Sequence, residues 1–222
     1  MSDSLLEDEP LDRFALERKW VTSVSRKDLT YNDYKNWPED VHAEIIDGQF
    51  YLMPTPNLRH NIIQCEISYQ LYNYFSDRTC AVRTARLGVR LAYEKSGLDN
   101  TIVEPDVIIV SDQSILWGKE TCEGVPNFIL EIVSRGESKK DLEIKRECYE
   151  RAGVKEYWVI GHPTFHIFNL VDGKYTETVK KLTRDLKQPL YEFPDCIVDF
   201  QSIMDKLYDL CPENNQNRKF SD

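Results

Sequence analysis

The chain has 222 residues, of which 41% are hydrophobic and 30% charged, and its net charge is −10. This balance is ordinary for a soluble globular protein, and no apolar run approaches the ~18 residues that a membrane helix needs. The surplus of 38 acidic over 28 basic residues excludes a protein that holds a polyanion by overall charge alone. A locally basic cleft would still allow such a partner.

The length suits one sizeable domain, which we expect over residues 13–211. Residues 1–12 and 212–222 are polar and aperiodic, so both are predicted to be flexible tails. The acidic start lacks the basic-then-apolar layout of a signal peptide, which predicts a cytoplasmic protein without a membrane anchor. The six cysteines include no CxxC pair, so reduced thiols are expected rather than a structural zinc site.

The first elements are marked by turn and capping residues. Residues 30–37 predict a short helix that begins at Thr30 and ends near Pro38. Asp47 and Gly48 separate two β-favouring runs, which indicates a hairpin with Glu44 on its first strand. Helical spacing of apolar residues then predicts a helix over 58–76, with Asn57 as its cap.

The middle of the chain alternates between strand-like runs and one well-marked helix. Strands are expected near residues 81–93, 101–110, 127–133 and 156–160, a helix over 138–152, and a further strand pair around 172–173. This order predicts a mixed α/β fold with a central mixed β-sheet flanked by helices.

Two carboxylates interrupt apolar strands. Glu131 lies within a run in which five of the six residues from 128 to 133 are apolar, and Asp106 lies where another strand enters an apolar stretch. A buried carboxylate costs several kcal/mol unless it is paired, protonated or bound to metal. Each could be a satisfied structural group by itself, but two intrusions on two strands favour one shared site.

The helix predicted over 138–152 has one apolar side and one polar side. At roughly 100° per residue, Asp141 and Lys145 are the only acidic or basic side chains on the apolar side, so they point toward the sheet. An inward salt bridge from Lys145 to Asp141 or Glu131 would explain this without any function. Because buried ion pairs are poor sources of stability, a functional role is the stronger interpretation.

Two carboxylates and a buried lysine suit metal-assisted hydrolysis of a phosphodiester. Carboxylate oxygens hold Mg²⁺ or Mn²⁺, and the ion lowers the pKa of a bound water and neutralises charge on the phosphate. Lysine would orient the attacking water and stabilise the negative charge of the transition state. We therefore expect Asp106, Glu131 and Lys145 to be catalytic.

Several motifs resemble a known family. Pro105-Asp106 matches the PD element of the PD-(D/E)xK nuclease superfamily, and Glu131 matches its acidic element, with Val133 in the place of the lysine. More narrowly, the sequence from about Tyr31 to Ile160 is similar to the Uma-type putative restriction endonuclease family. The motifs that carry this resemblance are the blocks at 43–48, 54–60, 105–107, 126–134 and 141–158, the last with Asp-x-x-x-Lys-x-x-x-Tyr and Ala-Gly-Val-x-Glu-Tyr-Trp.

The resemblance implies a restriction-endonuclease-like fold and further site residues. Lys145 would supply the missing lysine from the helix, and Glu44 would join Asp106 and Glu131 at the metal. His60 would contact phosphate or orient a carboxylate, although a solvent-facing histidine at a helix start is equally compatible. Asp141, Tyr149 and Arg135 are expected beside the substrate or behind the metal ligands. Residues 134–137 are Ser-Arg-Gly-Glu where the family commonly has Ser-Pro-Ser-Thr, so Arg135 is either a phosphate contact or a surface residue.

The leading hypothesis is an endonuclease that hydrolyses DNA with Mg²⁺ or Mn²⁺. A homodimer is expected because two cuts on a duplex are most simply made by two-fold symmetric subunits. Two alternatives remain open: a catalytically silent module of this fold that binds nucleic acid or protein, and a hydrolase of a smaller phosphate ester, which suits the net charge of −10 better. The aromatic residues Tyr69, Tyr72, Tyr74 and Phe75 at helical spacing indicate packing or a dimer contact rather than base stacking.

Overall fold

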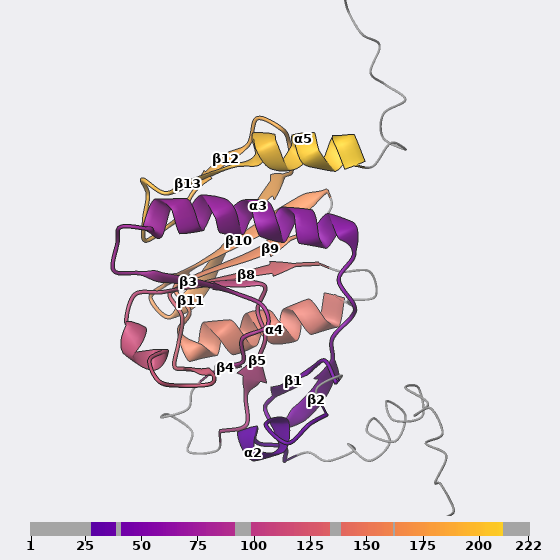
Figure 1. Ribbon diagram of the computed structural model, residues 1–222, viewed down its shortest axis with the longest axis vertical. Coiled ribbons are helices and arrows are strands. Elements are labelled where there is room, and N and C mark those ends of the chain that lie inside the picture. The colour runs from indigo at the N-terminus through magenta and orange to yellow at the C-terminus, as the bar shows by residue number, and fades with distance from the viewer. Residues whose placement is uncertain (1–27, 39–40, 92–98, 134–138, 162, 211–222) are drawn as a thin grey trace, which may run out of the picture.

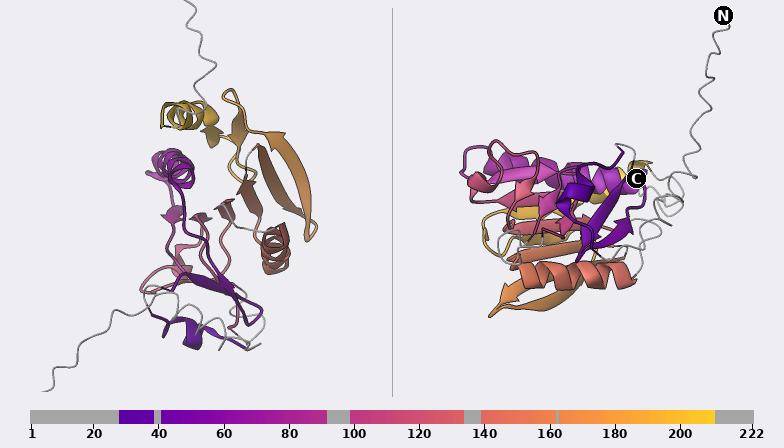
Figure 2. Two further views of the ribbon diagram at one scale, coloured as in Figure 1. Left: turned by 90° about the vertical axis from the view of Figure 1, so that its right-hand side faces the viewer. Right: turned by 90° about the horizontal axis from the view of Figure 1, so that it is seen from below.

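The computed structural model describes residues 28–38, 41–91, 99–133, 139–161 and 163–210. In these residues a six-stranded sheet has helices on both faces, and a second, smaller sheet lies beside it (Figure 1). The edge-on view in Figure 2 shows these layers separately. The arrangement confirms the mixed α/β class and adds a second sheet to the single one expected from the sequence.

The larger sheet has the strand order β11-β10-β9-β8-β6-β3. Its strands are β3 (Ala81–Thr84), β6 (Val107–Val110), β8 (Phe128–Ile132), β9 (Glu156–Ile160), β10 (Thr164–Val171) and β11 (Lys174–Lys181). Only β8 and β9 run parallel among these neighbours. The helix α4 (Lys139–Ala152) connects them, because a parallel pair needs a long crossover connection.

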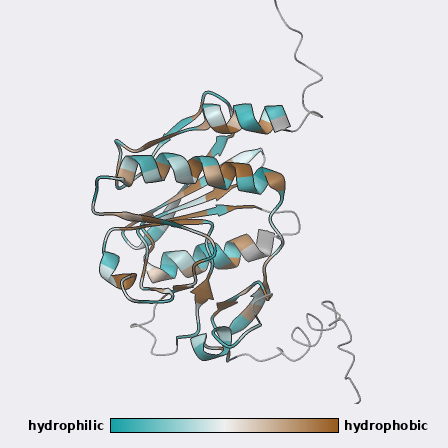
Figure 3. Ribbon diagram, in the orientation of Figure 1, coloured by the Kyte–Doolittle hydropathy of each residue, from teal (hydrophilic) through white to brown (hydrophobic). Residues whose placement is uncertain are grey.

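The helices divide between the two faces of this sheet. Helices α3 (Leu58–Phe75) and α5 (Phe200–Leu210) cover one face, and α4 covers the other (Figure 2). Along β8, Leu130 packs in the core beneath α3 and α5, whereas Ile129 packs in the core beneath α4. Since side chains alternate along a strand, Glu131 shares the α4 side with Ile129. Figure 3 shows that hydrophobic residues dominate these central strands, while the helices carry both kinds.

The second sheet has the strand order β2-β1-β5-β4-β7. Its strands are β1 (Ala43–Ile46), β2 (Gln49–Leu52), β4 (Val89–Arg90), β5 (Ile102–Val103) and β7 (Cys122–Glu123). The expected hairpin joins β1 to β2, and Asp47 and Gly48 take the positive φ values of 51° and 76° that its turn requires. The short helix α2 (Tyr31–Tyr34), which begins after Thr30 as expected, packs against this sheet.

Two strands expected to be continuous are each divided between the sheets. The run at 101–110 splits into β5 and β6 around Glu104, Pro105 and Asp106. Proline has no N–H for a ladder hydrogen bond, which explains an interruption there. The run at 81–93 likewise splits into β3 and β4, and residues 92 and 93 lie outside the described part. The interruption between β5 and β6 places Asp106 at the junction of the two sheets.

The helices agree with the capping signals where these are described. The side chain of Asn57 accepts a hydrogen bond from the His60 amide at the start of α3, 3.0 Å away. Gly153 ends α4 with a φ of 94°, whereas its expected cap Ser138 lies outside the described residues. No element had been expected after residue 181, where β12 (Lys187–Pro189), β13 (Ile197–Asp199) and α5 complete the fold. A short 3-10 helix at Gln113–Ile115 precedes β7.

Several other expectations concern surfaces and ends. Of the described cysteines, those at 122, 148 and 196 are buried, Cys65 is exposed and Cys80 lies between. Both predicted tails lie outside the described residues. On α3, Tyr69 and Tyr72 are exposed, whereas Phe75 is buried in the core. Within the described chain, no helix is both long and apolar enough to cross a membrane.

Candidate active site

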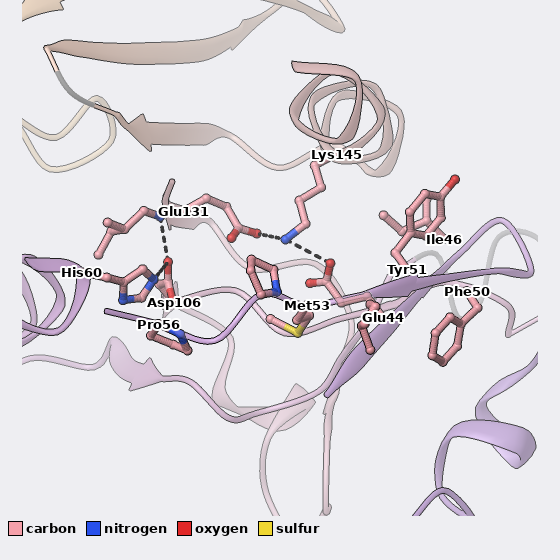
Figure 4. Close-up of a pocket in the computed structure, with 13 residues that line it drawn as sticks. Glu44, Ile46, Phe50, Tyr51, Met53, Pro56, His60, Asp106, Glu131 and Lys145 are labelled. Carbon is pink, nitrogen blue, oxygen red and sulfur yellow. Dashed lines mark hydrogen bonds and ion pairs between the residues drawn. The ribbon is translucent and has the colours of Figure 1, made fainter. Parts of the chain in front are cut away.

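Strand register brings the two predicted carboxylates together. Val107 pairs with Leu130 in the antiparallel ladder of β6 and β8, so the preceding Asp106 lies beside Glu131. Glu44 reaches the same place from β1 of the second sheet, and Lys145 reaches it from α4 (Figure 4). The relative exposures of Glu44, Asp106, Glu131 and Lys145 are 2%, 8%, 5% and 6%. The structure thus brings these predicted residues into one place.

Lys145 links two of the carboxylates. Its Nζ lies 2.9 Å from Oε1 of Glu131 and 3.0 Å from Oε2 of Glu44. The inward salt bridge to Glu131 that the sequence allowed is therefore present, and Glu44 is a second partner of the same ammonium. The side chain of Asp141, the other partner considered, lies outside the described residues. The Nζ of Lys145 therefore lies between two carboxylates that come from different sheets.

Asp106 is held by the neighbouring strand and by α3. Its Oδ2 accepts a hydrogen bond from the Ile132 amide at 2.7 Å, and Nε2 of His60 lies 3.1 Å away. Gln64 adds a hydrogen bond from Nε2 to the Asp106 carbonyl at 3.0 Å. His60 is buried, so the solvent-facing alternative is wrong, and its ring contacts a carboxylate as one of the anticipated roles requires.

Tyr149 lies one turn after Lys145 on α4 and is completely buried. Its hydroxyl donates a hydrogen bond of 2.7 Å to Oε1 of Glu131, the same oxygen that Lys145 contacts. Burial, reinforced by the negative charge of Glu131, raises the pKa of Tyr149 well above its ordinary value. The hydroxyl therefore stays protonated and acts as a hydrogen-bond donor.

Glu44 is held by further hydrogen bonds that were not predicted from the sequence. Oε1 of Glu44 accepts a hydrogen bond from the Glu104 amide at 2.8 Å. The carboxylate of Glu104 in turn accepts a hydrogen bond of 2.6 Å from the hydroxyl of Tyr34 on α2. Glu104 is buried, and its place within the apolar stretch at 102–110 was the same signal that pointed to Asp106. Nothing in the sequence around Tyr34 marked its role.

The buried groups line an open pocket of about 420 Å³. Its floor carries the four charged residues and His60, and its walls are mostly apolar (Figure 4). The wall and rim residues are Ile46, Phe50, Tyr51, Leu52, Met53, Pro54, Pro56 and Ile132. A site of this kind is accessible to a ligand although its ionisable groups are shielded from bulk water.

The donor set fits a divalent cation in chemistry and charge. Glu44, Asp106 and Glu131 contribute three carboxylates to one pocket and Lys145 contributes one ammonium, which leaves an excess of negative charge. The described side-chain contacts of Asp106 fall on Oδ2, which leaves Oδ1 as the oxygen that could ligate an ion. In the arrangement present, no three acidic, histidine or cysteine side chains of the described residues surround a single point closely enough to hold a metal. The Lys145 ammonium holds Glu44 and Glu131 instead.

Of the remaining predicted site residues, the structure describes the side chains of two and leaves those of two undescribed. Tyr149 and His60 lie directly behind Glu131 and Asp106. Arg135 and the side chain of Asp141 lie outside the described residues. The catalytic, metal-binding and substrate-binding roles of all these residues stay predictions, because geometry alone establishes only that they are neighbours.

Comparisons with known proteins agree with this architecture. A family model described as "Uma2: Putative restriction endonuclease" matches residues 31–199. Among solved structures, a putative nuclease belonging to DUF820 from Anabaena variabilis is similar, with a TM-score of 0.66 and 17% sequence identity. The match covers 79% of this chain and 99% of that one. No curated protein matches. The structural likeness confirms the fold that the sequence predicted.

Proposed function

Because this chain belongs to the Uma2 family of putative restriction endonucleases, we propose that it is a divalent-metal-dependent endonuclease that hydrolyses DNA at the Glu44–Asp106–Glu131–Lys145 pocket. One observation carries the proposal: three buried carboxylates from three separate elements converge with a buried lysine at the floor of an open pocket. Such a concentration of buried charge is a poor source of stability, which favours a functional explanation for it.

The proposed residues have distinct tasks. Asp106 and Glu131, with Glu44, would hold the ion through carboxylate oxygens, the ligands that Mg²⁺ and Mn²⁺ prefer. When bound, the ion would lower the pKa of a water molecule and neutralise charge on the scissile phosphate. The Ile132 amide and His60 keep Asp106 in place, and Tyr149 keeps Glu131 in place. Positioning of this kind lets the ligands act without reorganising.

The reaction would be a hydrolysis without a covalent intermediate. A water oxygen forms a new bond to phosphorus, and the bond from phosphorus to a sugar oxygen breaks. The water loses one proton, and the departing sugar oxygen gains one and becomes a hydroxyl. The ammonium of Lys145 would turn from the carboxylates toward the attacking water and the phosphate oxygens. There it would stabilise the charge that grows in the transition state.

The two other candidate functions predict different results. A silent module predicts no divalent-ion binding at the pocket, whereas a hydrolase of small phosphate esters predicts turnover of a monoester or a dinucleotide but not of long DNA. The net charge of −10 favours small substrates, and the family match favours DNA. The homodimer, the single domain over 13–211 and the cytoplasmic location stay proposals, the first testable by sedimentation.

The decisive test compares two buried glutamates. Purified protein with Mg²⁺ should cleave single-stranded circular DNA or nick supercoiled plasmid, and Glu131→Gln should lower the rate at least about a hundredfold because it removes a charged group from the centre. The matched control is Glu156→Gln, which alters an equally buried glutamate outside the pocket and should leave the rate within about threefold. Equal rates for wild type and Glu131→Gln would refute the assignment.

A further inference from the structure

The charged residues at the floor of the pocket are buried. Each of the four charged residues keeps less than a tenth of its surface exposed, yet all line a cavity that opens to solvent. A phosphodiester within an intact duplex lies on the outside of a wide and stiff rod. A strand that has left the duplex can bend into the pocket and bring its phosphate to Asp106 and Glu131, which a stiff rod does less easily.

The walls suit the base and sugar rather than the phosphate. Tyr51 pairs with Glu44 across the β1–β2 hairpin, so its ring lies on the same side of the sheet as the Glu44 carboxylate and borders the pocket (Figure 4). Ile46, two residues after Glu44 on β1, lies on the same side of the sheet. Met53, Pro54 and Pro56 border the pocket beyond β2. Flat apolar surfaces of this kind receive an unstacked nucleobase without regard to sequence.

Phe50 also borders the pocket, but its ring is held by a different set of neighbours. It packs edge-on against Trp37, with 5.2 Å between ring centroids, in the small core formed with α2. Side-chain alternation along β2 turns it away from Tyr51. Tyr51 is therefore the aromatic side chain on the Glu44 side of the hairpin.

Charge in the pocket supports the same conclusion. Among the described residues that line it, Lys145 is the only lysine or arginine, and its ammonium already contacts Glu44 and Glu131. A protein that grips duplex DNA neutralises many phosphates with such side chains, and its affinity falls steeply with salt. The described lining therefore offers an incoming nucleotide mainly apolar and stacking contacts.

We infer that the substrate is single-stranded or locally unpaired DNA. One extruded nucleotide lies in the pocket, with its base against Tyr51, Pro54 and Pro56. The inference rests on the proposed hydrolytic function and specifies its substrate. The phosphate beside that nucleotide lies on the carboxylates, and the rest of the strand leaves through the opening. A continuous duplex is excluded until a base pair opens.

Binding and cleavage test the inference separately. Fluorescence anisotropy would use the cleavage-deficient Glu131→Gln protein with Mg²⁺ and three labelled oligonucleotides: a single strand, its perfect duplex, and the duplex with one unpaired nucleotide. The single strand and the bulged duplex should bind at least about tenfold more tightly than the perfect duplex. Wild-type protein should cut the bulged duplex next to the unpaired nucleotide.

Matched variants locate the contact. In the same background, Tyr51→Ala should lower affinity for the single strand about tenfold, a typical loss for one stacked base. Tyr51→Leu keeps the apolar volume without a flat ring and should show most of that loss. Tyr69→Ala is the control, because Tyr69 is an exposed aromatic residue on α3 that does not line the pocket, and its affinity should match that of the parent protein.

The outcomes separate the two proposals. A perfect duplex that binds or is cut as well as the single strand overturns the substrate assignment and leaves the hydrolytic function intact. So does equal binding by the Tyr51 and Tyr69 variants. If no DNA is cleaved by wild type but the binding preferences hold, hydrolysis fails and the pocket remains a site for an unpaired nucleotide. Absence of any binding overturns the inference.

Discussion

Strands β8 and β9 lie side by side, and each buries a glutamate, yet the two carboxylates have opposite surroundings. Glu131 on β8 faces α4, where the ammonium of Lys145 and the hydroxyl of Tyr149 contact it and the pocket opens. Glu156 on β9 is 2% exposed and lies outside that pocket. Its oxygens accept hydrogen bonds from neutral donors, the Trp158 indole and the Tyr191 amide, both at 2.7 Å.

The difference shows that burial by itself does not distinguish a carboxylate in the candidate site from one in the core. Glu156 has no cation among these partners, and burial raises its pKa to about 7, so it loses its charge easily. Glu131 shares its cation with Glu44 and stays beside an opening to water. A compensating cation and access, added to burial, distinguish a site that can hold an ion from a satisfied structural group.

Replacing Lys145 should have the largest effect on the stability and activity of the pocket around Glu131. Lys145→Met would leave Glu44 and Glu131 buried without their shared ammonium, so the free energy of unfolding should fall by about 3–5 kcal/mol. Cleavage should fall at least about a hundredfold. Because a divalent ion can replace the missing charge, Mn²⁺ should restore more stability to the variant than it adds to wild type.

Chemical denaturation with and without Mn²⁺ measures this effect, and calorimetry at the same pH measures the affinity for Mn²⁺, which should rise about tenfold in the variant because the like charge is gone. If Mn²⁺ stabilises the variant no more than wild type, the ammonium and the metal do not share these carboxylates. Lys174→Met is the control, since Lys174 pairs with Glu150 at the surface and its loss should cost less than about 1 kcal/mol.

Glu156 on β9 should affect how the free energy of unfolding depends on pH, rather than how the protein responds to metal. Its pKa is raised by burial from 4.5 to about 7, so the folded state binds the proton more tightly than the unfolded state. This contribution to stability is complete below pH 4.5 and is lost as the pH rises through 7. Relative to Glu156→Gln, wild type should lose about 2–3 kcal/mol of unfolding free energy between pH 5 and pH 8.

Urea denaturation of both proteins across that pH range provides the measurement. The variant also loses one of the two hydrogen-bond acceptors, so the slope with pH, rather than the absolute stability, is the relevant quantity. Parallel curves for the two proteins would show that Glu156 is ionised in the folded state throughout the range.

A smaller effect should follow from the hydroxyl that supports Glu131. Tyr149→Phe removes the hydrogen bond to Oε1 and should lower the free energy of unfolding by about 1–2 kcal/mol, because hydrogen bonds to charged groups are stronger than neutral ones. Cleavage should fall about tenfold. Tyr175→Phe is the control, because the hydrogen bond it removes is a 3.1 Å contact with the Val154 carbonyl. A smaller loss of stability and unchanged cleavage are expected for it. Equal effects on cleavage would deny Tyr149 a positioning role.

The local parts of the fold could be predicted from the sequence because their causes are local. Asp47 and Gly48 specify a turn whose backbone few other pairs adopt. The helical period places Lys145 on the inward side of α4 without reference to the rest of the molecule. Asp106 and Glu131 were recognisable because a charged residue in an apolar strand requires an explanation.

The non-local parts could not be predicted in this way. The second sheet joins strands of only two residues, such as β4 and β7, through partners more than 30 positions apart, and no period can appear in so short a segment. Glu156 stands between Lys155 and an apolar run, a position that is ordinary for a surface charge, so nothing in the sequence marks its burial. Only the folded arrangement shows that one glutamate meets an ammonium and an opening, while the other meets an indole and an amide.

The position of Asp106 between β5 and β6 has a consequence for assembly. Glu44 is carried by the smaller sheet, Glu131 by the larger one, and Asp106 by the three-residue link between them. Neither sheet has the full acidic set until the two have docked. A newly made or partly unfolded chain in which the sheets are still apart therefore lacks the complete set of three carboxylates.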